Sequence, residues 1–552
     1  MIKKPHFKFD FWTIVTLGIV IVFALFLAYP LFSLFASGFR DPETQQFTMD
    51  NFAKFFTKKY YLRALGHSFL VTACTTVLAV AIGAPLAYAT TVFKIRGKGL
   101  VDVLVIISML SPPFIGAYSW IILGGRSGTI TAFFKEVFGI TTPSIYGFGG
   151  ILLVLTLKLY PFIYLYTKGA LKKVDVSLSE AAESLGCSAF RKVTTVIIPL
   201  IAPTILAGSL LVFMNALADF GTPMLIGEGY TVMPVLIYSE FISEMGGQAN
   251  FAAALAVILV VITGIMFLAQ KYVVNKKSFT MSSLRPIQAK QIHGLKNLLL
   301  HVLVYIVVML SIIPQITVIF TSFKATRGAM FAEGFSLDSY KSIFKNLGTP
   351  IINTYKFGFI ALVIIVVMAM FIAYITTRRK SWLTNSIDSM TMFPYIIPGS
   401  VLGITLLLAF NDKPMLLSGT AAIIIIAFVV RRLPYTLRSS AAILYQISPS
   451  MEEAAISLGD SPVKTFFKVT AVMMMPGVLS GAILSWITII NELSASVILY
   501  TGSTRTMSVA IYTEVIRASY GTAAALASIL TLTTIASLLL FFKLSGSKEV
   551  SL

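Results

Sequence analysis

Long apolar stretches alternate with short polar segments along the whole chain. About 20 apolar residues are needed for a helix to cross the hydrocarbon core of a bilayer, and in lipid the backbone polar groups must pair within the segment. The pattern predicts twelve transmembrane helices, at residues 12–37, 66–93, 101–123, 149–169, 200–222, 251–273, 298–322, 352–377, 384–410, 418–437, 473–499 and 521–542. The first run is too long for a removable signal peptide.

Composition agrees with this pattern. Of 552 residues, 57% are hydrophobic and only 12% are charged, whereas a soluble protein carries about a quarter charged residues. A soluble chain and an intrinsically disordered chain are both excluded. The two cysteines and four scattered histidines predict neither a disulfide framework nor a metal cluster. The expected class is an all-α polytopic membrane protein.

The net charge of +20 has an explanation within the membrane pattern. With the N-terminus in the cytoplasm, most Lys and Arg residues fall in cytoplasmic loops, as the positive-inside rule requires. Twelve spans then return the C-terminus to the cytoplasm as well. No soluble domain is left to carry a nucleic-acid site, so we expect no nucleic-acid partner.

The chain repeats itself. The sequence FTMDNFAKFF from Phe47 reappears as FSLDSYKSIF from Phe335, and LAYATT ending at Thr91 reappears as IAYITT ending at Thr377. Both copies start on the same side, so the repeat is parallel, with a pseudo-twofold axis along the membrane normal. We therefore expect two six-helix halves, residues 1–273 and 298–552, joined by a polar cytoplasmic linker at 274–297.

The strongest match lies in two cytoplasmic loops, at about 170–199 and 438–472. Each contains a run of good helix formers followed by a glycine that favours a helix end, EAAESLG and EAAISLG. Two gap-free copies favour a short helix that docks a soluble partner over an ordinary solvated loop. The candidate docking residues are Glu180, Ala181, Ala182, Gly186, Glu453, Ala454, Ala455 and Gly459.

Ionisable residues inside spans are costly and are candidates for function. Asp219 and Glu492 occupy matching places near the outer ends of the fifth spans. They are candidates for a translocation pathway; alternatively, each lies at the lipid–water boundary and pairs with a nearby Lys or Arg. Lys158 aligns with Arg431, and Arg432 follows it. The preferred interpretation of these three residues is snorkelling or pairing between helices. If they line a pathway instead, they favour an anionic substrate.

The loop residues carry a family resemblance. EAAESLG with Pro203 downstream, and EAAISLG with Pro476, resemble the EAA loop of binding-protein-dependent ABC transporter permeases. The fused format and the stretches beginning at Ser111, Ala218 and Pro394 resemble the ferric-iron permeases most. The pattern departs in one place, where an extra Pro199 in the first copy corresponds to Val472 in the second.

This resemblance implies a type I importer fold in the cytoplasmic (inner) membrane of a bacterium. Two copies of an ABC ATPase, which bring ATP and Mg, would each hold one loop as a coupling helix, and an extracytoplasmic binding protein would deliver ferric iron. Glu240 and Glu514 repeat in external segments and are candidates for docking that protein or for plain solvation. Pro113 and Pro398 in the third spans interrupt a helix and are pathway candidates, although a packed kink is commoner.

No catalytic motif is present. The chain lacks the G-x-x-x-x-G-K-[ST] phosphate loop and H-E-x-x-H, so ATP hydrolysis is expected in a separate subunit, with no cofactor in this chain. Three alternatives stay open. The same machinery would import a small phosphorylated or phosphonate anion, thiamine or a polyamine; an ion-coupled secondary transporter would also have twelve spans; a scaffold or receptor would show no substrate-stimulated ATPase.

Overall fold

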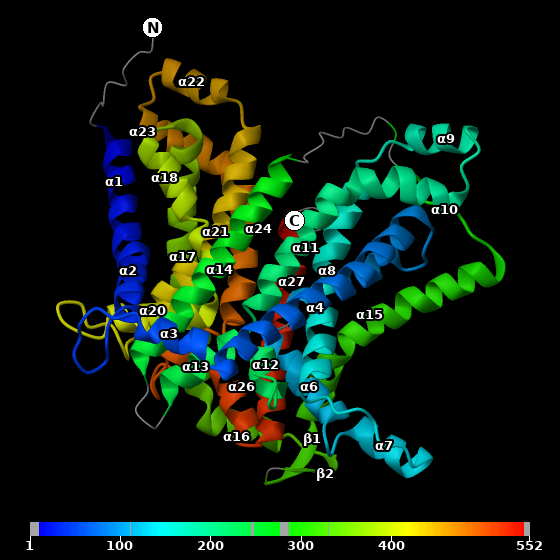
Figure 1. Ribbon diagram of the computed structural model, residues 1–552. Coiled ribbons are helices and arrows are strands. Elements are labelled where there is room, and N and C mark those ends of the chain that lie inside the picture. The colour runs from blue at the N-terminus through cyan, green and yellow to red at the C-terminus, as the bar shows by residue number, and fades with distance from the viewer. Residues whose placement is uncertain are drawn as a thin grey trace.

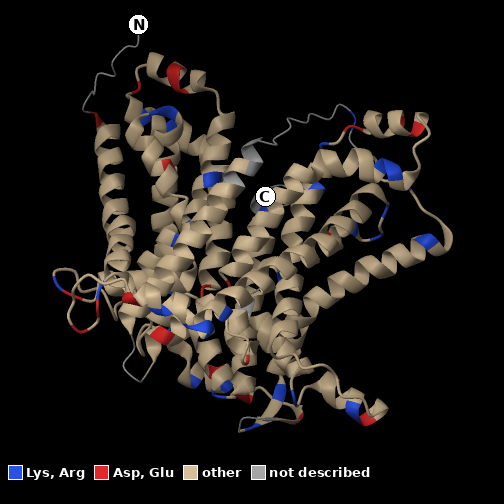
Figure 2. Ribbon diagram, in the orientation of Figure 1, with Lys and Arg blue, Asp and Glu red and all other residues tan. Residues whose placement is uncertain are grey.

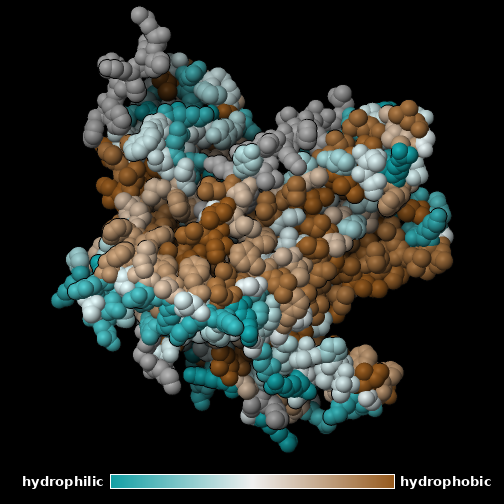
Figure 3. Space-filling view, viewed as in Figure 1, coloured by the Kyte–Doolittle hydropathy of each residue, from teal (hydrophilic) through white to brown (hydrophobic). Residues whose placement is uncertain are grey.

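The computed structural model describes residues 10–110, 112–243, 248–276, 285, 287–328 and 330–545, and it is built almost wholly of helices (Figure 1). Within this part, nine helices are long and apolar enough to cross a membrane, or ten if one bent pair counts as a span. Apolar side chains form a broad band between polar ends (Figure 3), and charged residues gather toward those ends (Figure 2). The chain is therefore an integral membrane protein.

The helices of the first half are α1 (Phe11–Phe23), η1 (Ala24–Ala28), α2 (Tyr29–Gly38), α3 (Asp50–Thr57), α4 (Lys59–Val92), α5 (Lys98–Leu110), α6 (Pro113–Gly124), α7 (Thr129–Phe138), α8 (Phe148–Leu171), α9 (Val176–Ser184), α10 (Ala189–Lys192), η2 (Val193–Ile197), α11 (Ile198–Leu217), α12 (Gly221–Ile226), α13 (Met233–Ile242) and α14 (Ala249–Lys276). The elements labelled η are single π-helical turns within longer helices.

The second half contains α15 (Gly294–Ser322), β1 (Lys324–Arg327), β2 (Met330–Phe335), α16 (Asp338–Asn346), α17 (Gly348–Arg378), α18 (Trp382–Met390), α19 (Phe393–Ile396), α20 (Gly399–Ala409), α21 (Ala421–Gln446), α22 (Pro449–Ser457), α23 (Pro462–Thr465), η3 (Phe466–Thr470), α24 (Ala471–Ile490), α25 (Ser496–Leu499), α26 (Met507–Ile516) and α27 (Tyr520–Ser545). All twelve predicted apolar segments correspond to helical structure, and nine of them to continuous apolar helices.

The three remaining segments differ from a simple span. In the first half, the third span is bent by 99° between Lys98–Leu110 and the helical run that starts at Phe114. In the second half, the third span is divided into α18, α19 and α20. Proline explains both interruptions, because it removes a backbone donor and clashes with the preceding turn. The third segment, 418–437, lies in α21, which carries Arg431 and Arg432 and is therefore less apolar.

The first span of each half reaches across to the other half. Helices α1 and α2 pack on α17, α18 and α20 of the second half as well as on α14, and α15 packs on α5 and α6 of the first half as well as on α27. The two spans lie at opposite edges of the molecule (Figure 1). Trp12 of α1 is buried against Tyr374 and Phe466, and the Arg379 guanidinium pairs with the Asp10 carboxylate. The exchange interlocks the halves, so neither six-helix sequence repeat is a separate body.

One short antiparallel hairpin departs from the helical pattern. Strand β1 pairs with β2 through Lys324↔Phe335 and Arg327↔Met330, and the hairpin lies against α16 and α27. The apolar pattern of the sequence does not predict this hairpin. Of the predicted linker 274–297, residues 277–284 and 286 lie outside the described part. Its end is tied to the first half, because the Lys290 amide donates to the Val92 carbonyl and the Lys94 amide donates to the Lys290 carbonyl.

Candidate functional site

The two candidate docking helices, α9 and α22, lie at the same end of the molecule (Figure 1). The Asp175 and Ser448 side chains cap their N-termini. Gly186 and Gly459 follow the two helices with φ of +80° and +97°, a left-handed conformation that glycine adopts without strain. The predicted short helix and its glycine stop are thus present in both copies.

Both helices present the same residues to solvent. Glu180, Ala181, Glu453 and Ala454 are exposed, whereas Ala182 is buried and Ala455 is half-buried beneath them. The leucines just before the two glycines are the most exposed large apolar residues of the helices: Leu185 is 85% and Leu458 90% exposed. Sequence reasoning missed these leucines, although the repeated S-L-G triplet marks them.

The two helices are anchored differently. On α22, the buried Glu452 carboxylate accepts a hydrogen bond from Arg378 Nε at 2.9 Å, and Arg378 also donates to the Ile447 carbonyl. In the first half Ser179 occupies the position of Glu452. There, the Val176 amide donates to the Arg285 carbonyl at 2.9 Å, and the Arg285 guanidinium lies 3.3 Å from the Glu180 carboxylate.

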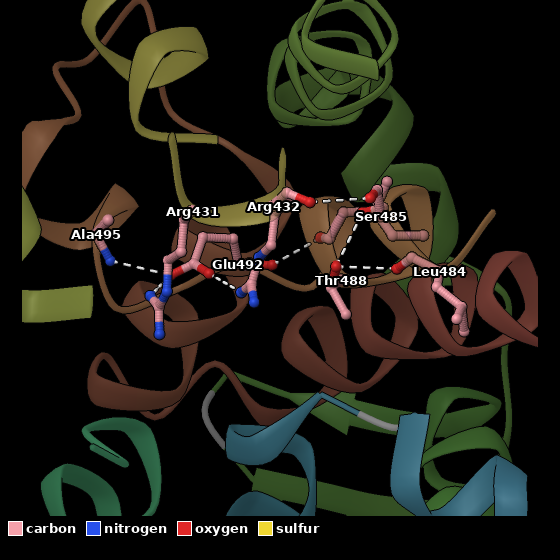
Figure 4. A network of polar contacts seen from close by, with 9 residues as sticks. Arg431, Arg432, Leu484, Ser485, Thr488, Glu492 and Ala495 are labelled. Carbon is pink, nitrogen blue, oxygen red and sulfur yellow. Dashed lines mark hydrogen bonds and ion pairs between the residues drawn. The ribbon is translucent and has the colours of Figure 1, made fainter. Parts of the chain in front are cut away.

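Two groups of buried ion pairs, with five charged side chains in all, are together called the central network. Asp219 follows α11 and accepts hydrogen bonds from Lys158 Nζ of α8 at 2.7 Å and from the Thr222 amide at 2.9 Å. Glu492 follows α24 and accepts from Arg431 Nη1 at 2.5 Å, from Arg432 and from the Ala495 amide (Figure 4). The side chains of Asp219 and Glu492 are only 4% and 3% exposed.

The network lies where the halves meet. The side-chain amide of Asn491, beside Glu492, donates to the Leu110 carbonyl of the first half at 3.1 Å. Of the two interpretations preferred for Lys158 and Arg431, snorkelling and pairing between helices, pairing is the arrangement found. The pathway role of Asp219 and Glu492 stays a prediction.

The interrupted third spans border this network. Pro398 precedes α20, and a Cβ at the adjacent Gly399 would lie only 1.7 Å from Arg431 Nη1, so Arg431 could not keep its present position with a larger residue there. Pro113 is the first residue of α6. Lys158 lines a pocket together with Ser108 and Pro112. The breaks thus bring backbone close to the charged side chains, which a continuous helix would not do.

A second pair of ion pairs escaped the sequence analysis. Asp102 at the start of the first third span pairs with Lys168 of α8 at 2.5 Å, and Asp388 in the second pairs with Arg438 of α21 at 3.2 Å. The repeat itself marked them, because both aspartates stand at matching positions in the two halves. Among the described residues, no group of three or more His, Cys, Asp and Glu side chains is arranged to hold a metal ion.

The opposite end of the molecule carries Glu240 on α13 and Glu514 on α26. Glu514 is buried, with its carboxylate 3.7 Å from Arg517, and Glu240 interacts with the Tyr61 hydroxyl. Aromatic residues at matching positions of the two halves are exposed at this end, one pair just before helices α3 and α16 and one pair within them. Phe47 and Phe335 are 73% and 72% exposed, and Phe56 and Phe344 are 59% and 70% exposed.

Comparisons with known proteins show which chains this one resembles. The chain is 29% identical over 97% of its length to the ferric transport system permease protein FbpB of Actinobacillus pleuropneumoniae, covering 78% of that protein. It is 28% identical over 89% of its length to the putative ferric transport system permease protein FbpB 1 of Haemophilus influenzae, again covering 78%. A solved bacterial alginate ABC transporter aligns with a TM-score of 0.42 at 17% identity, covering 49% of this chain and 95% of that one.

One family accounts for both halves. The model described as "Binding-protein-dependent transport system inner membrane component" matches residues 79–278 and again residues 365–545. Each match includes one candidate docking helix and one carboxylate of the central network. With two copies of the domain covering more than half of its length, the chain belongs to the family of binding-protein-dependent transport permeases, the membrane subunits of ABC importers.

Proposed function

We propose that this chain is the permease of an importer for ferric iron, in the cytoplasmic (inner) membrane of a bacterium. The observation that carries the substrate is the similarity to two ferric permeases over nearly the whole chain. The positive-inside rule supports cytoplasmic termini, because Lys and Arg gather in the loops on one side. The α9–α22 end is then cytoplasmic, and the end that carries α3 and α16 is external.

Two copies of an ABC ATPase dock on α9 and α22 in this proposal, and ATP and Mg are bound there rather than by the permease. Each helix offers an exposed Glu, an alanine face that permits close approach and one projecting leucine. One surface of the ATPase could accept both features, with an apolar groove for the leucine and a basic residue to pair with the carboxylate. The same kinds of exposed residue at matching positions of both helices support two similar docking sites.

An extracytoplasmic binding protein delivers iron to the external end. Exposed phenylalanines stand there at matching positions of the two halves: Phe47 matches Phe335, and Phe56 matches Phe344. Aromatic residues are enriched at protein interfaces, and these four positions support docking better than Glu514, whose carboxylate is buried. Glu240 stays a candidate for the same contact.

The substrate is tested by ATP-dependent uptake of ⁵⁵Fe into proteoliposomes that contain the chain, the ATPase and an iron-loaded binding protein. Uptake that requires all three components supports the proposal. Uptake driven by a proton gradient without ATP would indicate a secondary transporter. Uptake of phosphate esters, thiamine or polyamine but not iron would replace the substrate.

The docking sites are tested by the double substitution Glu180→Lys with Glu453→Lys. We expect the ATPase to be lost from the purified complex while membrane insertion is unchanged. The matched control is Glu43→Lys with Glu136→Lys, which makes the same charge change at exposed external positions and should leave the ATPase bound. Equal copurification of the ATPase with both variants contradicts docking at α9 and α22.

A further inference from the structure

The central network has more positive than negative charge. Three basic side chains, Lys158, Arg431 and Arg432, face two carboxylates, Asp219 and Glu492, which gives a formal charge of +1. All five side chains are less than one-fifth exposed. The network lies at the interface between the two halves, where substrates of permeases with internal repeats cross the membrane. A substrate therefore meets a positive centre rather than a negative one.

Neither carboxylate is free to hold a cation. The Asp219 carboxylate accepts from Lys158 Nζ and the Thr222 amide, and Glu492 accepts from two guanidinium groups and the Ala495 amide. A bare trivalent ion would have to displace these donors to gain oxygen ligands. Displacement would leave buried Lys and Arg side chains without a counter-charge, which is strongly unfavourable.

Some buried polar groups around the central network have no hydrogen-bond partner, and one of them is a donor that could bind an anion. Arg432 Nε is buried without a hydrogen-bond partner in the described part of the chain. The hydroxyls of Ser400, next to Gly399, and of Ser496, one residue after Ala495, are buried and unpartnered as well. Guanidinium and hydroxyl groups together bind oxyanions, and the guanidinium cannot ligate a metal ion.

We propose that ferric iron crosses this network already bound to oxygen-donor anions, as a complex whose net charge is zero or negative. The inference rests on the proposed import of iron and specifies the species that moves. The anions supply the oxygen ligands that the ferric ion needs, and the outer oxygen atoms of the complex face the three basic side chains. Lys158, Arg431 and Arg432 are the specificity-determining residues, and Asp219 and Glu492 position them.

The decisive measurement is the charge that enters per iron. Proteoliposomes containing the complete transporter take up ⁵⁵Fe from the iron-loaded binding protein while a voltage-sensitive dye reports charge movement. We expect zero or negative charge per iron. A value of +1 or more overturns the inference and leaves iron import standing. Absence of ATP-dependent iron uptake overturns the proposed function, and the inference falls with it.

The variant Arg432→Gln gives opposite predictions for the two species. Neutralising the excess charge should slow uptake of an anionic or neutral complex by at least fivefold, whereas it would speed a repelled bare cation. The matched control is Arg438→Gln on the same helix, at the ion pair with Asp388, which should keep the rate within twofold. Faster iron uptake by Arg432→Gln contradicts the inference; if that variant fails to fold, the wild-type charge measurement decides.

Discussion

The Nζ atom of Lys158 lies 2.7 Å from the carboxylate of Asp219, which stands 61 positions further along the chain. Arg431 stands in the same relation to Glu492, at 2.5 Å and again 61 positions apart. The fourth and fifth spans of each half are therefore joined by an ion pair at the same depth. Since the geometry occurs twice in one chain, it belongs to the repeat itself.

Breaking this pair from one side should destabilise the protein. We expect Lys158→Met to lower the free energy of unfolding by about 3–5 kcal/mol, because the buried Asp219 carboxylate loses its counter-charge. Adding Asp219→Asn should recover most of that loss. Unfolding in detergent micelles measures both. Arg126→Met is the control, because Arg126 and its partner Glu228 are 75% and 46% exposed and such pairs contribute less than about 1 kcal/mol.

The exchange of first spans predicts unequal effects of two tryptophans. Trp12 is 1% exposed and packs on the second half, whereas Trp382 is 79% exposed. Trp12→Ala should cost about 3–5 kcal/mol by leaving a cavity, and Trp382→Ala less than about 0.5 kcal/mol. The unfolding temperatures of the two variants provide the comparison. Equal temperatures would mean that α1 does not pack on the second half.

Neighbouring glutamates on α22 should separate anchoring from docking. Glu452→Gln weakens the buried contact with Arg378, so we expect a lower unfolding temperature and slower iron uptake. Glu453→Gln, at an exposed position, should leave the unfolding temperature unchanged and weaken only the binding of the ATPase. Affinity of the purified ATPase for each variant tests this division. It fails if both variants lose stability equally.

The first docking helix should respond to acid. A hydrogen bond from Lys192, together with the charges of Lys192 and Lys290, lowers the pKa of Glu183 below its ordinary value of 4.5. Because the pKa of Glu183 is lower in the folded state than in the unfolded state, its ionised carboxylate stabilises the fold at pH values above the ordinary pKa. This stabilisation is lost as the pH falls through the pKa of the folded state. The difference in unfolding temperature between wild type and Glu183→Gln should therefore be present at pH 7 and shrink below about pH 4.5. A constant difference would contradict the pairing.

Features that depend on neighbours in the chain were predictable. The apolar runs that form helices, the repeat and the glycine stops at Gly186 and Gly459 all follow from local patterns, and each is present in the structure. The candidate positions Asp219 and Glu492 were identified because they match between the halves. The pairing of Asp219 with Lys158 and of Glu492 with Arg431 could not be distinguished from a role in a pathway, because the span boundaries do not reveal which helix faces meet.

By itself, the sequence determined that this protein is a helical membrane protein of two related halves, because the length and apolarity of each segment decide whether it crosses lipid. The tertiary structure alone decided that α1 packs on the second half and α15 on the first, and that Gly399 gives Arg431 room to reach Glu492. The physical reason is that lipid accepts every apolar helix face equally. Partners are chosen by side-chain fit and charge between segments far apart in the chain, which no local pattern records.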